Sequence, residues 1–188
     1  MKRRTFMGLC LAAACAAGTP AQAQLRSKPD PTLDHLFERL AKAQAPAQAR
    51  QIAETIGRRL ARSGSDTVDL LVSRANGALA ADDPALAIEL LDRAIMLRPQ
   101  WAEGWNTRAL VFFALDDLTR AMADLVEVLR LEPRHYQAMM GLGAIMQQRG
   151  QLKAAYHLFQ RAQAIYPLYD KSNEALDKLR PQEEGLDL

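Results

Sequence analysis

The chain has 188 residues, of which 49% are hydrophobic and 24% charged, and its formal net charge is +2. This composition is typical of one soluble globular domain with a core of ordinary size. The near-neutral balance excludes a nucleic-acid-binding stripe and a polybasic membrane-binding surface. Because alanine, leucine, arginine, glutamine and glutamate abound while aromatic residues make up only 6%, helices are expected throughout.

Residues 1–23 have the layout of a secretory signal peptide. Paired arginines at positions 3 and 4 are followed by an apolar stretch from Phe6 to about residue 17, and an A-x-A cleavage pattern ends at Ala23. The stretch is too short for a comfortable permanent membrane anchor. The sequence therefore predicts export to the periplasm and cleavage near Ala23. A general secretory signal and a twin-arginine signal both fit the paired arginines. Residues 24–31 are expected to form a flexible linker.

Both cysteines, Cys10 and Cys15, lie in the leader, so the mature chain is expected to contain no disulfide, no cysteine-ligated metal and no cysteine nucleophile. The residues before Cys15 weakly resemble a lipoprotein cleavage box. They lack its bulky residue three positions earlier, which favours the A-x-A site. Cleavage near Ala23 lowers the basic count from 24 to 21 against 22 acidic residues, a net charge of about −1. No integral membrane segment is expected in the mature chain.

Residues 32–64 contain two apolar stripes at helical spacing, separated by a break at Pro46. The pattern predicts a pair of helices that ends at Gly64. The first stripe contains Leu33, Leu36, Phe37 and Leu40, and the second contains Ala49, Ile52, Ala53, Ile56 and Leu60.

A repeat of 34 residues follows, marked by Pro99, Pro133 and Pro167. The residues between these prolines keep the same register. Small residues recur at positions 75, 109 and 143 and at positions 87, 121 and 155, and large ones recur around Trp105. The spacing predicts three units over residues 65–98, 99–132 and 133–166. A closing helix is expected over 167–181, stopping at Pro181, with a tail over 182–188.

These residues resemble the tetratricopeptide repeat (TPR), whose signature is W-x2-L-G-x2-Y, then A-x3-F, then P. The third unit matches best, with Leu142-Gly143, Ala155, Phe159 and Pro167. The resemblance implies an all-α, right-handed solenoid of antiparallel helix pairs, in which residues 32–64 form a degenerate pair that caps the N-terminal end of the stack. Residues 63–71, 102–109 and 131–135 also resemble small exported repeat proteins of Gram-negative bacteria, a resemblance that implies no assigned activity.

Several conspicuous polar residues have structural explanations. Asp83 and Asp117 each precede a predicted helix, so Asp116-Asp117 is expected to cap a helix and not to form a catalytic pair. Gly150 is expected to end a helix. Arg108 is expected to pair with Asp124 or Glu127, and Trp105 and Phe112, on one helical face, are expected in the core.

The resemblance implies a concave face lined by the first helix of each unit. Its mixture of amides, carboxylates and apolar groups suits a peptide or protein partner. Because the inward positions include no lysine or arginine, a basic or neutral segment is expected. The alternatives are that these positions are only solvated, or are covered by the tail of the chain. The inward positions are Asp69, Val72, Asn76, Leu79, Glu103, Asn106, Leu110, Phe113, Gln137, Met140, Ala144 and Gln147.

Three further residues are candidate surface anchors. Trp101 either packs against Trp105 or stands exposed for a partner. Arg134 and His135 form either a surface handle with a proton-transferring histidine, or a loop pair bonded to backbone carbonyls or Glu132; the second is favoured.

No catalytic residue, metal site or cofactor is expected, because the remaining histidines lack ligand spacing and no Gly-rich loop is present. The predicted function is a non-catalytic interaction scaffold in the cell envelope. The alternatives are an accessory or regulatory subunit of an envelope enzyme or assembly complex, and a self-associating protein with homo-oligomers formed through the repeat faces.

Overall fold

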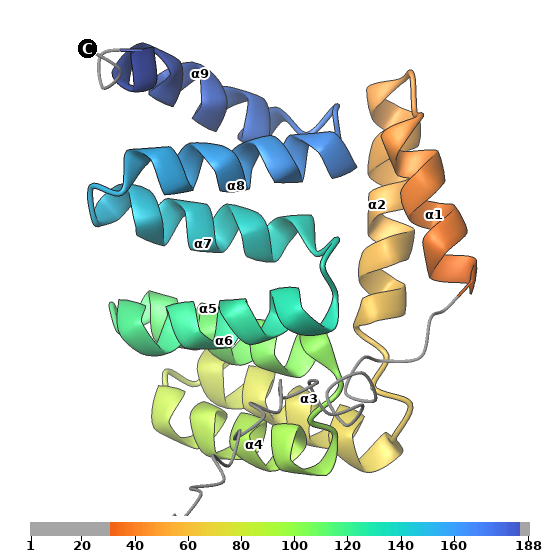
Figure 1. Ribbon diagram of the computed structural model, residues 1–188. Helices are drawn as coiled ribbons and strands as arrows, with labels where there is room; N and C mark the ends of the chain where they lie inside the picture. Colours follow the sequence, from red (N-terminus) through yellow and green to blue (C-terminus); the bar gives the residue numbers. More distant parts are fainter. Residues whose placement is uncertain (1–30, 185–188) are drawn as a thin grey trace, which may run out of the picture.

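The computed structural model describes residues 31–184, and this part of the chain is entirely helical apart from its turns (Figure 1). The predicted signal peptide, both cysteines, the predicted linker up to residue 30 and the last four residues of the predicted tail lie outside the described residues. Among the described residues, no helix is both long and apolar enough to cross a membrane. The helices are α1 (Pro31–Ala41), α2 (Pro46–Leu60), α3 (Asp66–Ala80), α4 (Pro84–Leu97), α5 (Ala102–Ala114), α6 (Leu118–Leu131), α7 (Tyr136–Gln148), α8 (Leu152–Ile165) and α9 (Asp170–Glu184).

Helices α3 to α9 form a stack of antiparallel pairs with α3–α4 at one end and α9 at the other (Figure 1). The turn inside each pair has a positive φ angle at the same repeat position. Asp82 and Asp116 have φ of 59°, and Gly150 has φ of 73° at the equivalent position. Asp83 and Asp117 then accept a hydrogen bond from a backbone N–H in the first turn of α4 and α6. The expected caps and the helix-ending glycine are confirmed.

Small residues lie where the helices of a pair cross. Ala75, Ala109 and Gly143 are buried at equivalent positions. A Cβ atom built at Gly143 would lie within 2.9 Å of three ring atoms of Phe159, so even alanine would displace that ring. The repeated small residue is therefore what allows each pair to pack closely.

The N-terminal hairpin α1–α2 does not cap the N-terminal end of the stack, and that prediction is wrong. The hairpin lies beside the stack (Figure 1), and its apolar stripes share one core with Tyr136, Met139, Ala162 and Tyr166 of the third unit. The core formed by α3, α4 and Val111 contains no residue of the hairpin. Tyr136 and Tyr166 contribute a large apolar surface to this shared core, and residues of α2 lie beside them.

Three smaller expectations also need correction. Trp105 is only partly buried at the edge of the second unit's core, whereas Phe112 is fully buried as expected. Helix α1 begins at Pro31, one residue inside the predicted linker. Helix α9 continues past Pro181 to Glu184; a proline inside a helix removes one backbone hydrogen bond, which does not always end the helix.

Candidate functional groove

A cavity of about 480 Å³, called the groove below, lies between α5, α7 and the start of α9. Most of its lining is apolar, and the polar groups among it come from different units of the stack. Its lining residues are Glu103, Asn106, Ala109, Leu110, Phe113, Leu125, Gln137, Met140, Gly141, Ala144, Tyr169 and Lys171.

The groove gathers the inward positions predicted for the second and third units except Gln147. Leu110 and Phe113 are exposed, at 59% and 43%, and therefore offer apolar surface to a partner. The positions predicted for the first unit do not take part. Asp69 accepts a hydrogen bond from the Ser63 hydroxyl at 2.5 Å, and Asn76 and Gln147 are exposed outside the lining. Val72 packs on the core of α3–α4, and Leu79 also lies outside the lining.

Tyr169 and Lys171 line the groove and were not predicted. Lys171 lies 34 residues after Gln137, which itself lies 34 residues after Glu103, so α9 continues the register of the first helices. Extending the repeat by one more unit would have found Lys171. The expectation that the groove contains no basic side chain is therefore wrong: it has a carboxylate on one helix and an ammonium group on another.

Glu103 is held in place by two neighbours. The Asn106 amide donates to Glu103 Oε1 at 3.0 Å, and His135 Nε2 lies 3.1 Å from Glu103 Oε2. His135 Nδ1 accepts from the backbone N–H of Ala138 at 3.2 Å, so Nδ1 carries no proton and we assign the proton to Nε2. His135 is thus a neutral helix cap that donates to Glu103. Asn106, only 6% exposed, directs its amide at Glu103 and not at a ligand backbone.

His135 and Arg134 are not surface anchors. His135 is only 1% exposed. The Arg134 guanidinium pairs with Glu132, as favoured from the sequence, and also with Asp34 at 2.6 Å. It lies over the Phe37 ring at 4.5 Å. The hydrogen bond to Glu132 is the main cause that raises the pKa of Arg134. These contacts attach the N-terminal hairpin to the third unit.

Trp101 fits neither of its predicted roles. It is the residue before α5, and its indole N–H donates to the Leu60 carbonyl at 2.8 Å. A Cβ built at Gly104 would lie 2.9 Å from the Trp101 ring, so Gly104 makes room for the indole. Trp101 therefore connects the end of α2 to the start of α5, a structural function.

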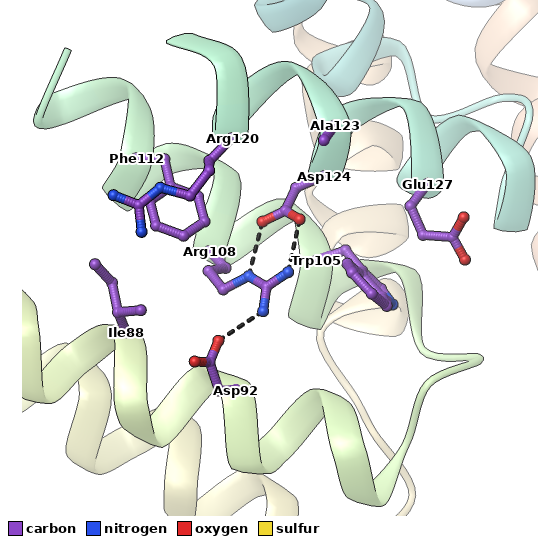
Figure 2. Close-up of a pocket in the computed structure, with 9 residues that line it drawn as sticks. All are labelled: Ile88, Asp92, Trp105, Arg108, Phe112, Arg120, Ala123, Asp124 and Glu127. Carbon is purple, nitrogen blue, oxygen red and sulfur yellow. Dashed lines mark hydrogen bonds and ion pairs between the residues drawn. The ribbon is translucent and has the colours of Figure 1, made fainter. Parts of the chain in front are cut away.

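A second cavity, of about 530 Å³, lies between α4, α5 and α6 (Figure 2). Its centre is Arg108, which binds Asp124 through two hydrogen bonds of 2.8 and 2.7 Å and Asp92 through one of 2.6 Å. The predicted pairing with Asp124 is confirmed, whereas Glu127 pairs with Arg130. The hydrogen bond to Asp124 is the main cause that raises the pKa of Arg108. Because these charges satisfy one another, we interpret this cavity as structural.

Within residues 31–184, no group of three or more histidine, cysteine, aspartate or glutamate side chains could hold a metal ion. A smaller hollow of about 260 Å³ beside α2 shares Gln137 and Tyr169 with the groove. Gln137 and Tyr169 therefore border both the groove and a hollow beside the N-terminal hairpin.

Known structures share this fold. The Arabidopsis OM64 TPR domain has a TM-score of 0.58 at 20% identity, covering 62% of this chain and 97% of that chain. The first TPR of Spaghetti (RPAP3), bound to an HSP90 peptide, has a TM-score of 0.60 at 18% identity, covering 64% and 95%. The Yersinia enterocolitica type III secretion chaperone SycD, in complex with a peptide of the translocator YopD, has a TM-score of 0.59 at 14% identity, covering 63% and 96%.

No known family profile matches the chain. A TPR repeat-containing protein of Rhizobium etli is 34% identical over 158 residues, which cover 84% of this chain and 78% of that protein. The shared sequence extends over most of both proteins, and the helix pairs repeat with the TPR period. The chain therefore belongs to the family of TPR repeat-containing proteins.

Proposed function

We propose that this protein is a non-catalytic interaction module of the cell envelope that holds a segment of a peptide or protein partner in the groove. The observation that carries the proposal is the lining of the groove. Exposed Leu110 and Phe113 lie beside Glu103, whose carboxylate is already oriented by His135 and Asn106. A carboxylate held in this way loses little side-chain entropy when it meets a ligand cation.

The lining also limits the chemistry of the ligand. An apolar side chain would contact Leu110, Phe113 and Met140, whose thioether adapts to different shapes. A basic side chain or an amide would bind Glu103. Lys171 would donate a hydrogen bond to a carbonyl or carboxylate farther along the same segment. We therefore expect a short mixed segment, with an apolar residue near a basic or neutral polar one, and not a run of acidic residues.

Peptide binding by related folds supports the proposal. The Spaghetti (RPAP3) domain is bound to an HSP90 peptide, and SycD is in complex with a peptide of YopD. These peptides are ligands of those two proteins and are not assigned to this chain. What supports binding here is that this chain places exposed apolar side chains in a groove between first helices.

The envelope location is supported by residues 1–23. It is tested by cell fractionation and by the intact mass of the exported protein, which should begin at Gln24. Changing Arg3→Lys with Arg4→Lys distinguishes the routes, because a twin-arginine substrate should stay in the cytoplasm and a general secretory substrate should still be exported. Retention of the uncleaved parent chain in the cytoplasm would refute the envelope location.

The binding proposal is tested on arrays of short immobilised peptides. Wild type is compared with Leu110→Glu plus Phe113→Ser, both in the groove, and with Val126→Glu, a 53%-exposed apolar position on α6 outside the lining. Circular dichroism checks that all three are folded. The expected result is a set of peptides rich in apolar and basic residues, bound by wild type and the control and lost by the groove variant. Equal binding by all three proteins would refute the groove as the site.

A further inference from the structure

We propose that the groove contains an apolar pocket that admits one bulky apolar side chain of the partner, an inference that rests on the proposed function. The pocket lies between α5 and α7, where the second unit of the stack meets the third. Its floor is Leu125 of α6, and its walls are five residues of α5 and α7. These wall residues are Leu110, Phe113, Met140, Gly141 and Ala144.

Leu125 shows how deep the pocket is. It belongs to α6, the second helix of its pair, and only 3% of it is exposed, yet it lines the groove. The groove therefore reaches past the first helices to the layer behind them. Gly141 keeps this path open, because a Cβ atom there would lie 3.3 and 3.7 Å from the two terminal methyl carbons of Leu125. A side chain at this position would cover part of the floor.

The equivalent positions are filled one unit earlier. Thr107 and Leu110 of α5 lie 34 residues before the glycine and the alanine of α7. Leu91, which lies 34 residues before the floor residue, is 0% exposed. The pocket is therefore not a gap that every pair of units has. It depends on two small residues, Gly141 and Ala144, and these set the size of the side chain that can enter.

The charged and hydrogen-bonding residues of the groove lie at its other end. Glu103, Gln137 and Lys171 are each the second residue of a helix, and Tyr169 directly precedes α9. Asn106 lies one turn farther along α5, where its amide is bonded to Glu103. The remaining lining residues are apolar. The groove thus has a polar end at the helix starts and an apolar end at the pocket.

An apolar side chain is the group that gains most in the pocket. Leu110 and Phe113 are 59% and 43% exposed, so a bound side chain would remove their surface from water together with its own. A charged or amide group would lose its hydration there, because the walls contain no side-chain amide, hydroxyl or charge to replace it. Leucine, methionine or phenylalanine is long enough to approach the floor, whereas alanine is not.

The distance between the two ends sets the spacing of the side chains that the groove recognises. Gly141 lies four residues after Gln137, which corresponds to about 6 Å along α7. In an extended segment, side chains on one side recur every two residues, about 7 Å apart. On a helix, the same separation corresponds to four residues. The apolar residue should therefore lie two positions from the basic residue that binds Glu103 in an extended segment, or four positions from it in a helical one.

The test uses synthetic nine-residue peptides as probes, immobilised at high density. Each probe has lysine at its third position and serine elsewhere, except for alanine, leucine or phenylalanine at its fifth or seventh position. The pocket variant, Gly141→Ala with Ala144→Leu, is compared with wild type and with the control Gly77→Ala plus Ala80→Leu. The control makes the same two changes on α3, outside the groove, where a Cβ atom at Gly77 would meet nothing within 4 Å.

Circular dichroism and urea unfolding check that every variant is folded. Ala144→Leu is also measured alone, so that the test does not depend on the double variant. Leucine fits this repeat position, because its equivalent in α5 is Leu110.

Wild type and control should bind the leucine and phenylalanine probes at least about tenfold more tightly than the alanine probe, since apolar pockets discriminate by size. In both pocket variants this ratio should fall to about one. The pocket would be overturned by a ratio near one in wild type, by no binding of any probe, by a high ratio in the pocket variants, or by an equal fall in the control. The peptide arrays with Leu110→Glu plus Phe113→Ser decide the proposed function separately, because those changes leave Gly141 and Ala144 intact.

Discussion

The Arg108–Asp124 pair allows the sharpest test of how the stack is held together. The side chain of Asp124 is only 6% exposed and that of Arg108 17% exposed. Replacing Arg108 with leucine leaves Asp124 as a buried charge without its partner, which should lower the free energy of unfolding by about 3–5 kcal/mol. Asp124→Leu should cost less, about 1.5–3 kcal/mol, because Arg108 keeps Asp92, which is 50% exposed.

The double variant Arg108→Leu with Asp124→Leu should be within about 1 kcal/mol of wild type, because replacing both members of a buried pair with apolar residues is often neutral. Urea unfolding followed by circular dichroism measures all four corners of this cycle. Circular dichroism is preferred to tryptophan fluorescence, since Arg108 lies over the Trp105 ring at 5.0 Å and its removal changes the indole environment.

The surface pair between Arg130 and Glu127 serves as the control. Arg130→Leu should cost less than about 1 kcal/mol, since both partners are partly exposed, at 41% and 27%. If the double variant loses the sum of the two single losses, then the pair is not coupled and the cavity of Figure 2 is not held by the charges that line it.

Three further predictions concern stability. Burial raises the pKa of Tyr136, Tyr166 and Tyr169, so these tyrosines ionise in the unfolded chain at a lower pH than in the folded one. The free energy of unfolding should therefore fall as pH rises above about 10. Tyr136→Phe should make the urea midpoint less dependent on pH in this range, and an unchanged pH dependence would contradict the contribution of Tyr136. A hydrogen bond from Arg130 lowers the pKa of Glu127. The ionised Glu127 therefore stabilises the fold above its unfolded pKa of about 4.3, and this stabilisation is lost as pH falls through the folded pKa. Glu127→Gln should make the free energy of unfolding fall less between neutral and acid pH, and the same fall in wild type and variant would refute this. Gly150→Ala should lower the free energy of unfolding by about 1–2 kcal/mol, because Gly150 has a φ of 73°. Gly57→Ala, inside α2 where a Cβ atom would meet nothing within 4 Å, should raise it by about 0.5–1 kcal/mol. Urea midpoints that change in the same direction for both variants would show that backbone conformation does not cause these effects.

The local features of the stack could be predicted from the sequence because their causes are neighbours in the chain. Asp83 and Asp117 cap the helices that they precede, and Gly150 ends the one before it. The register of Pro99, Pro133 and Pro167 then located each helix pair. Arg108 and Asp124 were also predictable as a pair, since the antiparallel crossing of two consecutive helices brings them together.

The position of the N-terminal hairpin could not be predicted in the same way. The stripe around Leu33 and Phe37 shows that one face of the hairpin is buried, but it does not show against which unit. From the sequence, that face could pack on the neighbouring unit α3–α4 or on a unit farther along the chain, and in the structure it packs on the tyrosines of the third unit. The ion pair from Arg134 to Asp34, 100 residues apart, helps to select the third unit, and no local pattern contains it.

The groove was predicted only as far as the repeat was followed. The register located Glu103, Asn106 and Gln137 correctly, but it ended with the third unit, so Lys171 was missed. The repeat register also predicts only where a residue lies on the backbone, and it does not predict which hydrogen bonds its side chain makes. Asp69 lies at the repeat position of Glu103, yet its carboxylate accepts a hydrogen bond from the Ser63 hydroxyl, near the start of α3.

One tyrosine connects the hairpin to the groove. Tyr169 stacks on Tyr166 at 5.2 Å and meets Tyr136 edge-on at 5.3 Å, and the same residue lines the groove. Because the hairpin packs on Tyr136 and Tyr166, it supports that wall. A hairpin stacked on α3–α4 would leave these tyrosines exposed to water and that wall of the groove without support. The position of the hairpin is therefore part of what forms the groove.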